Sequence, residues 1–150
     1  MLTKTVTGAN GRTLYARVRA RDRAGNNGLW SGNSDGIKVD TVAPRLSAAG
    51  PRNYLAVDLG FSEAVVNADK ASNYVCSRGL RVLQAQRLGT AGTAYLLHTT
   101  AQIPGTSYTV TVLPSVKDPA GNPVDPRYPV ARVQLRRENG CGTMGFVPVK

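Results

Sequence analysis

Apolar and polar residues alternate in several short stretches of this chain, which is the pattern of half-buried β-strands. Residues 14–21 place small apolar side chains at even positions and tyrosine or arginine at odd positions. Because a strand directs alternate side chains to opposite faces, we expect the apolar set to face a core and the arginines to face water. Residues 36–40 predict the returning strand of the same hairpin.

A longer series of alternating stretches follows between residues 45 and 135. Leu55, Val57, Leu59 and Phe61 are expected to point inward. Further strands are predicted at residues 74–76, 80–88, 94–99, 108–113 and 130–135. Strands at this spacing, separated by turn residues, favour an antiparallel β-sandwich over a βαβ fold. Residues 63–72 tolerate a helix, and we expect a short helical turn there.

One five-residue phrase occurs twice, about one domain length apart. Asp22-Arg23-Ala24-Gly25-Asn26 returns as Asp118-Pro119-Ala120-Gly121-Asn122, and each copy follows an alternating stretch that opens near a tyrosine. Asp and Asn side chains bond the local backbone in turns, and Gly supplies a positive φ without steric cost. The repeat therefore predicts a strand-then-turn unit in tandem small β-sandwich modules.

The predicted organisation has three parts. Residues 1–43 are expected to be the C-terminal fragment of a β-sandwich module, because the strands that should cover Val18 and Trp30 are missing and a hairpin this small buries too little surface to fold alone. Residues 44–135 are expected to form one complete sandwich after a short proline-bearing linker. Residues 136–150 lose the alternation and are predicted to be a tail or an edge strand.

Two parts of the chain resemble known families. Residues 14–26, with Trp30-Ser31 and the Asp-Thr-x-x-Pro joint at 40–44, resemble the last strands of bacterial fibronectin type III or related Ig-like repeats. Residues 45–135 resemble the bacterial Ig-like domain found in S-layer and other surface proteins. The phrases that carry this second resemblance are Phe61-Ser62-Glu63-Ala64-Val65, Asn73-Tyr74, residues 104–112 and residues 118–123.

The resemblance implies an all-β fold: an Ig-like antiparallel β-sandwich with a partial second β-sandwich module at the N-terminus. It also implies an extracellular, non-catalytic and modular architecture. Tyr108 is in phase with the inward residues of its strand, whereas Tyr15 is out of phase. Tyr108 is therefore the better candidate for the tyrosine-corner hydrogen bond of such domains.

Composition adds a strong positive charge to this picture. The 150 residues carry 19 Lys+Arg against 9 Asp+Glu, for a formal net charge of +10. Such a charge favours an anionic partner, although an arginine-rich genomic composition with solvated strand faces also explains it. No helix-turn-helix, zinc-finger or stacking pattern accompanies the charge, so no specific nucleic acid is expected. No apolar run approaches the ~20 residues that span a membrane, so no membrane span is expected.

Three arginines could form a binding stripe on one face of the first hairpin. Arg17, Arg19 and Arg21 share a face if their strand is regular. The stripe would then bind an anion such as an acidic polysaccharide or a cell-wall polymer. The simpler interpretation, which we favour, is a solvated edge whose charges prevent strand-to-strand aggregation.

The candidates for catalysis are few. His98 is the only histidine, and no sequence pattern supplies it with a nucleophile and an orienting acid. We therefore expect no enzyme activity, no catalytic residue and no cofactor. A zinc site is not expected either, because the two cysteines do not form a CxxC pair.

Calcium is the sharper metal hypothesis. Asp22 and Asn26, and later Asp118 and Asn122, offer oxygen ligands near the ends of the two modules. An ion at such a joint would stiffen a tandem array. The competing interpretation, which we favour, is that these Asp and Asn side chains only cap their own turns.

The two cysteines leave two alternatives open. Cys76 and Cys141 could pair in an oxidising compartment, where closing the loop between them would contribute about 4 kcal/mol. Alternatively they are unrelated thiols, with Cys76 acting as a small buried apolar residue.

Taken with the resemblance, these observations predict a non-catalytic structural or adhesive spacer module of a secreted or cell-surface multidomain bacterial protein. Its expected partners are the neighbouring domains of the same polypeptide and cell-wall or extracellular polysaccharide. The alternative is an accessory carbohydrate-binding module of an extracellular enzyme. A third and weaker hypothesis is a basic nucleic-acid binder.

Overall fold

The computed structural model describes residues 5–136. The chain divides into two compact units, Met1–Val42 and Ala43–Lys150, and each is described here by itself. Within residues 5–136, no helix is long and apolar enough to cross a membrane.

The first unit is a long hairpin with little regular strand. Its strands β1 (Thr13–Leu14) and β2 (Ile37–Lys38) pair antiparallel. Beyond them the two arms stay joined, because the Ser31 amide donates to the Val18 carbonyl over 2.8 Å and the Ser34 amide to the Ala16 carbonyl over 2.8 Å. The predicted regular strand over 14–21 is therefore wrong for most of its length.

Serine side chains explain why the ladder is irregular. The amides of Ala16 and Val18 donate to the hydroxyl oxygens of Ser34 and Ser31, over 3.0 Å and 2.9 Å, instead of to opposite carbonyls. A side-chain acceptor of this kind competes with the backbone ladder. The hairpin therefore remains joined without forming long β-strands.

The hairpin also lacks a core. The described residues of the first unit include no buried side chain, and Val18 is 72% exposed. The expectation that the even-numbered apolar residues face a core is therefore wrong within this structure. The physical reason is that a two-stranded ribbon has no second layer to cover either face.

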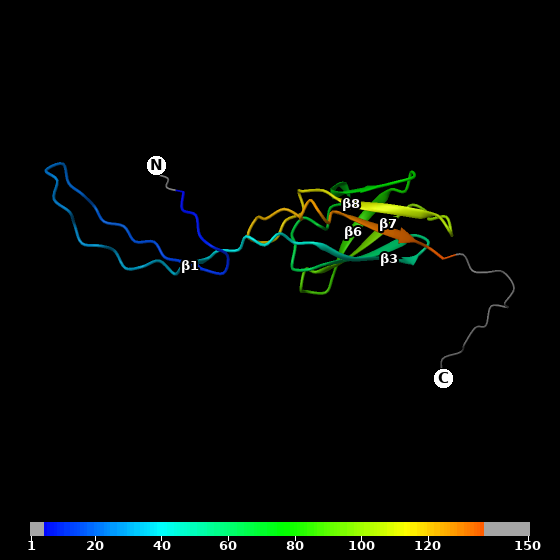
Figure 1. The fold of residues 1–150 in the computed structure, drawn as a ribbon, viewed down its shortest axis with the longest axis horizontal. Helices are drawn as coiled ribbons and strands as arrows, with labels where there is room; N and C mark the ends of the chain where they lie inside the picture. The colour runs from blue at the N-terminus through cyan, green and yellow to red at the C-terminus, as the bar shows by residue number, and fades with distance from the viewer. Residues whose placement is uncertain (1–4, 137–150) are drawn as a thin grey trace, which may run out of the picture. The chain divides into compact units, whose positions relative to one another are not determined.

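The second unit is an all-β sandwich built of antiparallel strands. Its first sheet has the order β3-β4-β7-β6 and its second the order β5-β8-β9. The strands are β3 (Leu46–Asn53), β4 (Ala56–Phe61), β5 (Tyr74–Cys76), β6 (Val82–Leu88), β7 (Ala94–Thr99), β8 (Ser107–Val112) and β9 (Val130–Gln134). In Figure 1, β8 (yellow) and β9 (orange) run side by side, as their pairing requires. This architecture confirms the predicted fold class.

The core lies between the two sheets. Val57 and Leu97 are neighbours in the first sheet, and Val110 and Val133 come from the second; all are almost completely buried. Phe61 and Tyr95 add an edge-to-face ring contact, with centroids 5.8 Å apart. Alternation of inward and outward residues along β4 and β8 therefore builds one apolar layer, as the sequence predicts.

Two elements differ from the sequence prediction. Strand β3 was not expected, because Gly50 and Pro51 are unfavourable in strands. It forms nevertheless because it has one hydrogen-bonded neighbour, β4, and a proline is tolerated on such an edge. Leu55 is 41% exposed rather than inward, since it lies in the turn just before β4.

The stretch 63–72 is mostly a loop, and the predicted short helical turn forms only at its end, as the 3-10 turn Ala71–Asn73. Two buried phenols hold this loop: Tyr74 donates to the carbonyl of Ala68 over 2.6 Å, and Tyr95 to that of Val65 over 2.9 Å. Asn67 also has φ of 63°, which a right-handed helix excludes. Burial raises the pKa of Tyr74, so the phenol stays protonated.

Candidate functional site

The two copies of the repeated phrase form the same turn. Asn26 donates its backbone and side-chain amides to the two carboxylate oxygens of Asp22, over 2.8 Å and 2.9 Å. Asn122 does the same to Asp118, over 2.8 Å in both cases. The Asp22 and Asp118 amides in turn donate to the Asn26 and Asn122 carbonyls over 3.0 Å. The sequence repeat is therefore a repeat of structure.

A glycine with positive φ is part of each turn. Gly25 has φ of 96° and Gly121 has φ of 97°. Both donate their amides to the carbonyl of the turn's aspartate, over 3.2 Å and 3.1 Å. A side chain at either position would be strained, so the turn chemistry predicted from the sequence is correct.

Burial distinguishes the two turns. Asp118 is 2% exposed and lies two residues after the fully buried Val116. The Val116 carbonyl accepts from the Val124 amide over 3.0 Å. Asp22 is exposed, and the Asn26 side-chain amide lowers its pKa by hydrogen bonding to the carboxylate. The second copy is thus anchored in the sandwich, whereas the first lies at the tip of a solvated hairpin.

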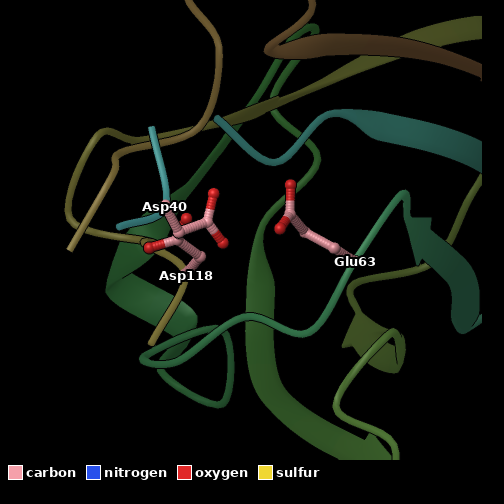
Figure 2. Close-up of side chains that lie close together, drawn as sticks. All are labelled: Asp40, Glu63 and Asp118. Atoms are coloured by element: carbon pink, nitrogen blue, oxygen red, sulfur yellow. The ribbon is translucent and has the colours of Figure 1, made fainter. Parts of the chain in front are cut away.

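These contacts bear on the calcium hypothesis. Each aspartate oxygen already accepts a hydrogen bond within its own turn, which is the capping role. Sequence reasoning missed Glu63, whose carboxylate lies within 4.8 Å of that of Asp118 (Figure 2). Glu63 follows β4 and lies outside both copies of the repeated phrase, so the sequence pattern does not link it to Asp118. Calcium binding at these turns stays a prediction.

A second acidic group is neutralised by arginine. The buried Asp125 accepts from Nε and Nη2 of Arg127, over 3.0 Å and 2.8 Å, and its Oδ2 lies 3.6 Å from Nε of Arg45. The Arg127 hydrogen bonds, with Arg45 adding a further positive charge, lower the pKa of Asp125 to about 2. Both guanidiniums also lie over the Tyr128 ring, 5.0 Å and 5.7 Å from its centroid. Asp125, the two arginines and Tyr128 therefore form one network of ion pairs and cation–π contacts.

The predicted arginine stripe is only partly assembled. Arg17 and Arg19 both lie over the ring of Trp30, with their guanidinium carbons 4.6 Å and 4.8 Å from its centroid. Arg21 points elsewhere, since its Nε donates to the carbonyl of Gly25 over 3.2 Å. The structure therefore brings two of the three predicted arginines together and adds a tryptophan to them.

Cys76 lies half-buried on β5, and burial raises the pKa of its thiol, which disfavours the reactive thiolate. Cys141 lies outside the described residues, as does the expected edge strand or tail beyond residue 136, so the disulfide stays a prediction. His98 lies half-buried in β7 between Ala56 and Gln84 of the neighbouring strands.

A hollow of about 300 Å³ lies beside the loop 65–70 of the sandwich. Asp69, Lys70, Arg87 and Tyr95 line it. Two of these groups already have backbone partners, because Tyr95 donates to the Val65 carbonyl and Arg87 to the Thr90 carbonyl. Asp69 is the one carboxylate among the residues that line this hollow, whereas glycoside hydrolysis typically uses a pair.

The sequence matches no protein-family model, and no curated protein matches it. Its fold is similar to parts of bacterial surface-layer proteins. The S-layer protein rSbsC(31-844) matches at 15% identity and a TM-score of 0.55, over 63% of this chain and 14% of that chain. The N-terminal part of the bacterial S-layer protein SbsC matches at 15% identity and a TM-score of 0.56, over 63% of this chain and 24% of that chain.

A third structure, domains 1-6 of the surface layer protein SbsC, matches at 14% identity and a TM-score of 0.56, over 64% of this chain and 14% of that chain. The chain thus spans at most 24% of these structures. A likeness at this identity concerns the fold alone.

Proposed function

We propose that this chain is a non-catalytic structural module of a secreted or cell-surface multidomain protein. The observation that carries the proposal is the fold likeness to S-layer proteins, whose matched parts are small fractions of long chains. A sandwich with one continuous apolar core suits a spacer, because close packing of that core stabilises the fold. The proposed role depends on this fold, which the Asp118–Asn122 turn helps to stabilise.

We further infer that residues 44–135 form an Ig-like domain. Lettered A to G in chain order, β3 to β9 give the sheets A-B-E-D and C-F-G. This is the strand order of a seven-stranded constant-type Ig sandwich. The order supports the Ig-like assignment independently of sequence likeness.

Tyr108 supports the same inference. It lies near the start of β8, the sixth strand of the sandwich, and its hydroxyl oxygen accepts from the amide of Ile103 over 3.0 Å. A tyrosine at the start of the sixth strand that bonds the backbone a few residues upstream is the tyrosine corner of Ig-like domains. The proposal also makes residues 1–43 the C-terminal part of a fibronectin type III-like module, which the exposed Val18 and Leu29 support.

Surface exposure on the native cell tests the proposed function. An antibody raised against the chain should label intact cells of the organism that encodes it, and protease added outside should remove the signal. Labelling that requires permeabilised cells would contradict a surface or secreted location. The alternative, an accessory carbohydrate-binding module of an extracellular enzyme, predicts that the antibody isolates a glycan-degrading activity with the parent protein.

A further inference from the structure

The cluster formed by Arg17, Trp30 and Arg19 follows from the hairpin's register. Val18 and Ser31 are opposite one another in the hairpin, so Trp30 lies across from Arg19 and diagonal to Arg17. Both guanidinium carbons lie within 4.8 Å of the ring centroid, and the tryptophan remains 48% exposed. The guanidiniums of Arg17 and Arg19 therefore lie together at the Trp30 ring on the solvent-exposed hairpin.

A comparison within the same chain shows what this cluster lacks. At Tyr128, two arginines also lie over one ring, but Asp125 pairs with both of them. Within residues 5–136, no carboxylate forms an ion pair with Arg17 or Arg19. The nearest acidic residue in sequence, Asp22, accepts from Asn26 instead. The first cluster therefore holds its two positive charges together without an internal anion.

We infer that the Arg17–Trp30–Arg19 cluster binds the carboxylate groups of an acidic polysaccharide. Guanidinium groups form bidentate hydrogen bonds with carboxylates, and a bound anion would relieve the repulsion between the two cations. Side chains two residues apart on an extended arm lie about 7 Å apart at their base, so the pair can contact successive acidic units of a linear polymer. The exposed edge of Trp30 adds an apolar surface for the sugar.

Single-stranded nucleic acid is the less suitable polyanion for this cluster. Its binding sites stack successive bases on open aromatic faces. Here two guanidiniums lie over the Trp30 ring, so charged N–H donors occupy positions where a base would stack. This inference goes beyond the proposed spacer role and does not depend on it, because binding is a property of the isolated chain.

Trp30 is the only tryptophan of the chain, so its fluorescence reports directly on this cluster. Polygalacturonate added to the full chain should change the emission of Trp30 saturably, while neutral dextran should not. The Arg17→Gln/Arg19→Gln variant should bind polygalacturonate at least about tenfold more weakly, because two charge-assisted hydrogen-bond partners are lost. The Arg17→Lys/Arg19→Lys variant keeps the charge and should bind with intermediate affinity, since lysine cannot form the bidentate contact.

A matched control separates this site from net charge. Arg81 and Arg132 are exposed residues of the sandwich, and Arg81→Gln/Arg132→Gln removes the same two charges elsewhere. This control should bind within about twofold of the unmodified chain, as expected for charges outside the site. Equal weakening in both glutamine variants, an unchanged Trp30 emission, or tighter binding of single-stranded DNA than of polygalacturonate would each overturn the inference.

Discussion

At the scale of single residues, the repeated Asp-x-Ala-Gly-Asn phrase is explained by hydrogen bonds rather than by a ligand. Asp22 and Asp118 make the same contacts within their turns to almost the same distances. Their surroundings differ, because Asp118 is 2% exposed and Asp22 is open to water. The same hydrogen bonds should therefore contribute more to the free energy of unfolding in the buried Asp118 turn than in the exposed Asp22 turn.

Substituting the buried copy tests this difference. Asp118→Ala should lower the free energy of unfolding by about 1–3 kcal/mol, since it removes the buried carboxylate that accepts two hydrogen bonds from the part-buried Asn122. Asp22→Ala is the matched control and should change it much less, because water replaces the lost acceptor. Urea unfolding of both variants measures the difference. Similar losses in the two variants would show that the turns matter for another reason than burial.

The network around Asp125 predicts a pH dependence of stability. The pKa of Asp125 in the folded state, about 2, lies below the value of about 3.9 in an unfolded chain. Its interactions with Arg127 and Arg45 therefore stabilise the fold above about pH 4, and this contribution is lost as the pH falls towards 2. The change in unfolding free energy between pH 5 and pH 2.5 should be smaller in Asp125→Asn than in the unmodified chain. An identical pH dependence in both would contradict the assignment.

At the scale of elements, each strand is stabilised by the contacts of its inward side chains with the opposite sheet. Leu97 on β7 is fully buried between the sheets, whereas Leu83 on β6 is 62% exposed. The same residue type thus contributes a core contact on one strand and a solvated surface on its neighbour. Only the first can stabilise the sandwich substantially.

Truncating these two leucines tests the position of the core. Leu97→Ala should reduce the free energy of unfolding by about 2–5 kcal/mol, because it removes transfer energy and leaves a cavity. Leu83→Ala should stay within about 0.5 kcal/mol, as surface substitutions usually do. Chemical denaturation of the two variants provides the measurement. A large loss at Leu83 would place the core on the other face of β6.

The sequence predicted most of these elements where side-chain alternation decides the structure. The strands at 74–76 and 94–99 have the predicted bounds, because their apolar residues face one buried layer. Strand β3 was missed because Pro51 is acceptable only on an edge, and edges are set by topology. The helical turn expected within 63–72 is confined to Ala71–Asn73, because the hydroxyls of Tyr74 and Tyr95 donate to carbonyls of the preceding loop.

The sites show the same limit. The sequence gives the repeated turns directly, since their bonds are local. It cannot place Glu63 beside Asp118, or the Trp30 ring beneath the guanidiniums of Arg17 and Arg19, because those contacts depend on register and folding. The prediction of a long strand in the first hairpin was wrong because the hydroxyls of Ser31 and Ser34 accept hydrogen bonds from the opposite arm. The alternation of apolar and polar residues does not reveal these acceptors.

At the scale of the whole molecule, stability and recognition are assigned to different units. The sandwich holds the buried core, in which Val57, Leu97 and Val110 are almost completely enclosed. The hairpin has no buried side chain among its described residues and presents the arginine–tryptophan cluster to solvent. Its structure rests on exposed hydrogen bonds, which are individually weak in water.

Amide hydrogen exchange of the full chain, followed residue by residue by NMR, tests this division most directly. The amides of Val57, Leu97 and Val110 should exchange at least about a thousandfold more slowly than those of Val18 and Ser31, because the former open only with the sandwich. Comparable protection in the hairpin and the sandwich would contradict the account, since the hairpin would then have stability that its exposed side chains do not explain.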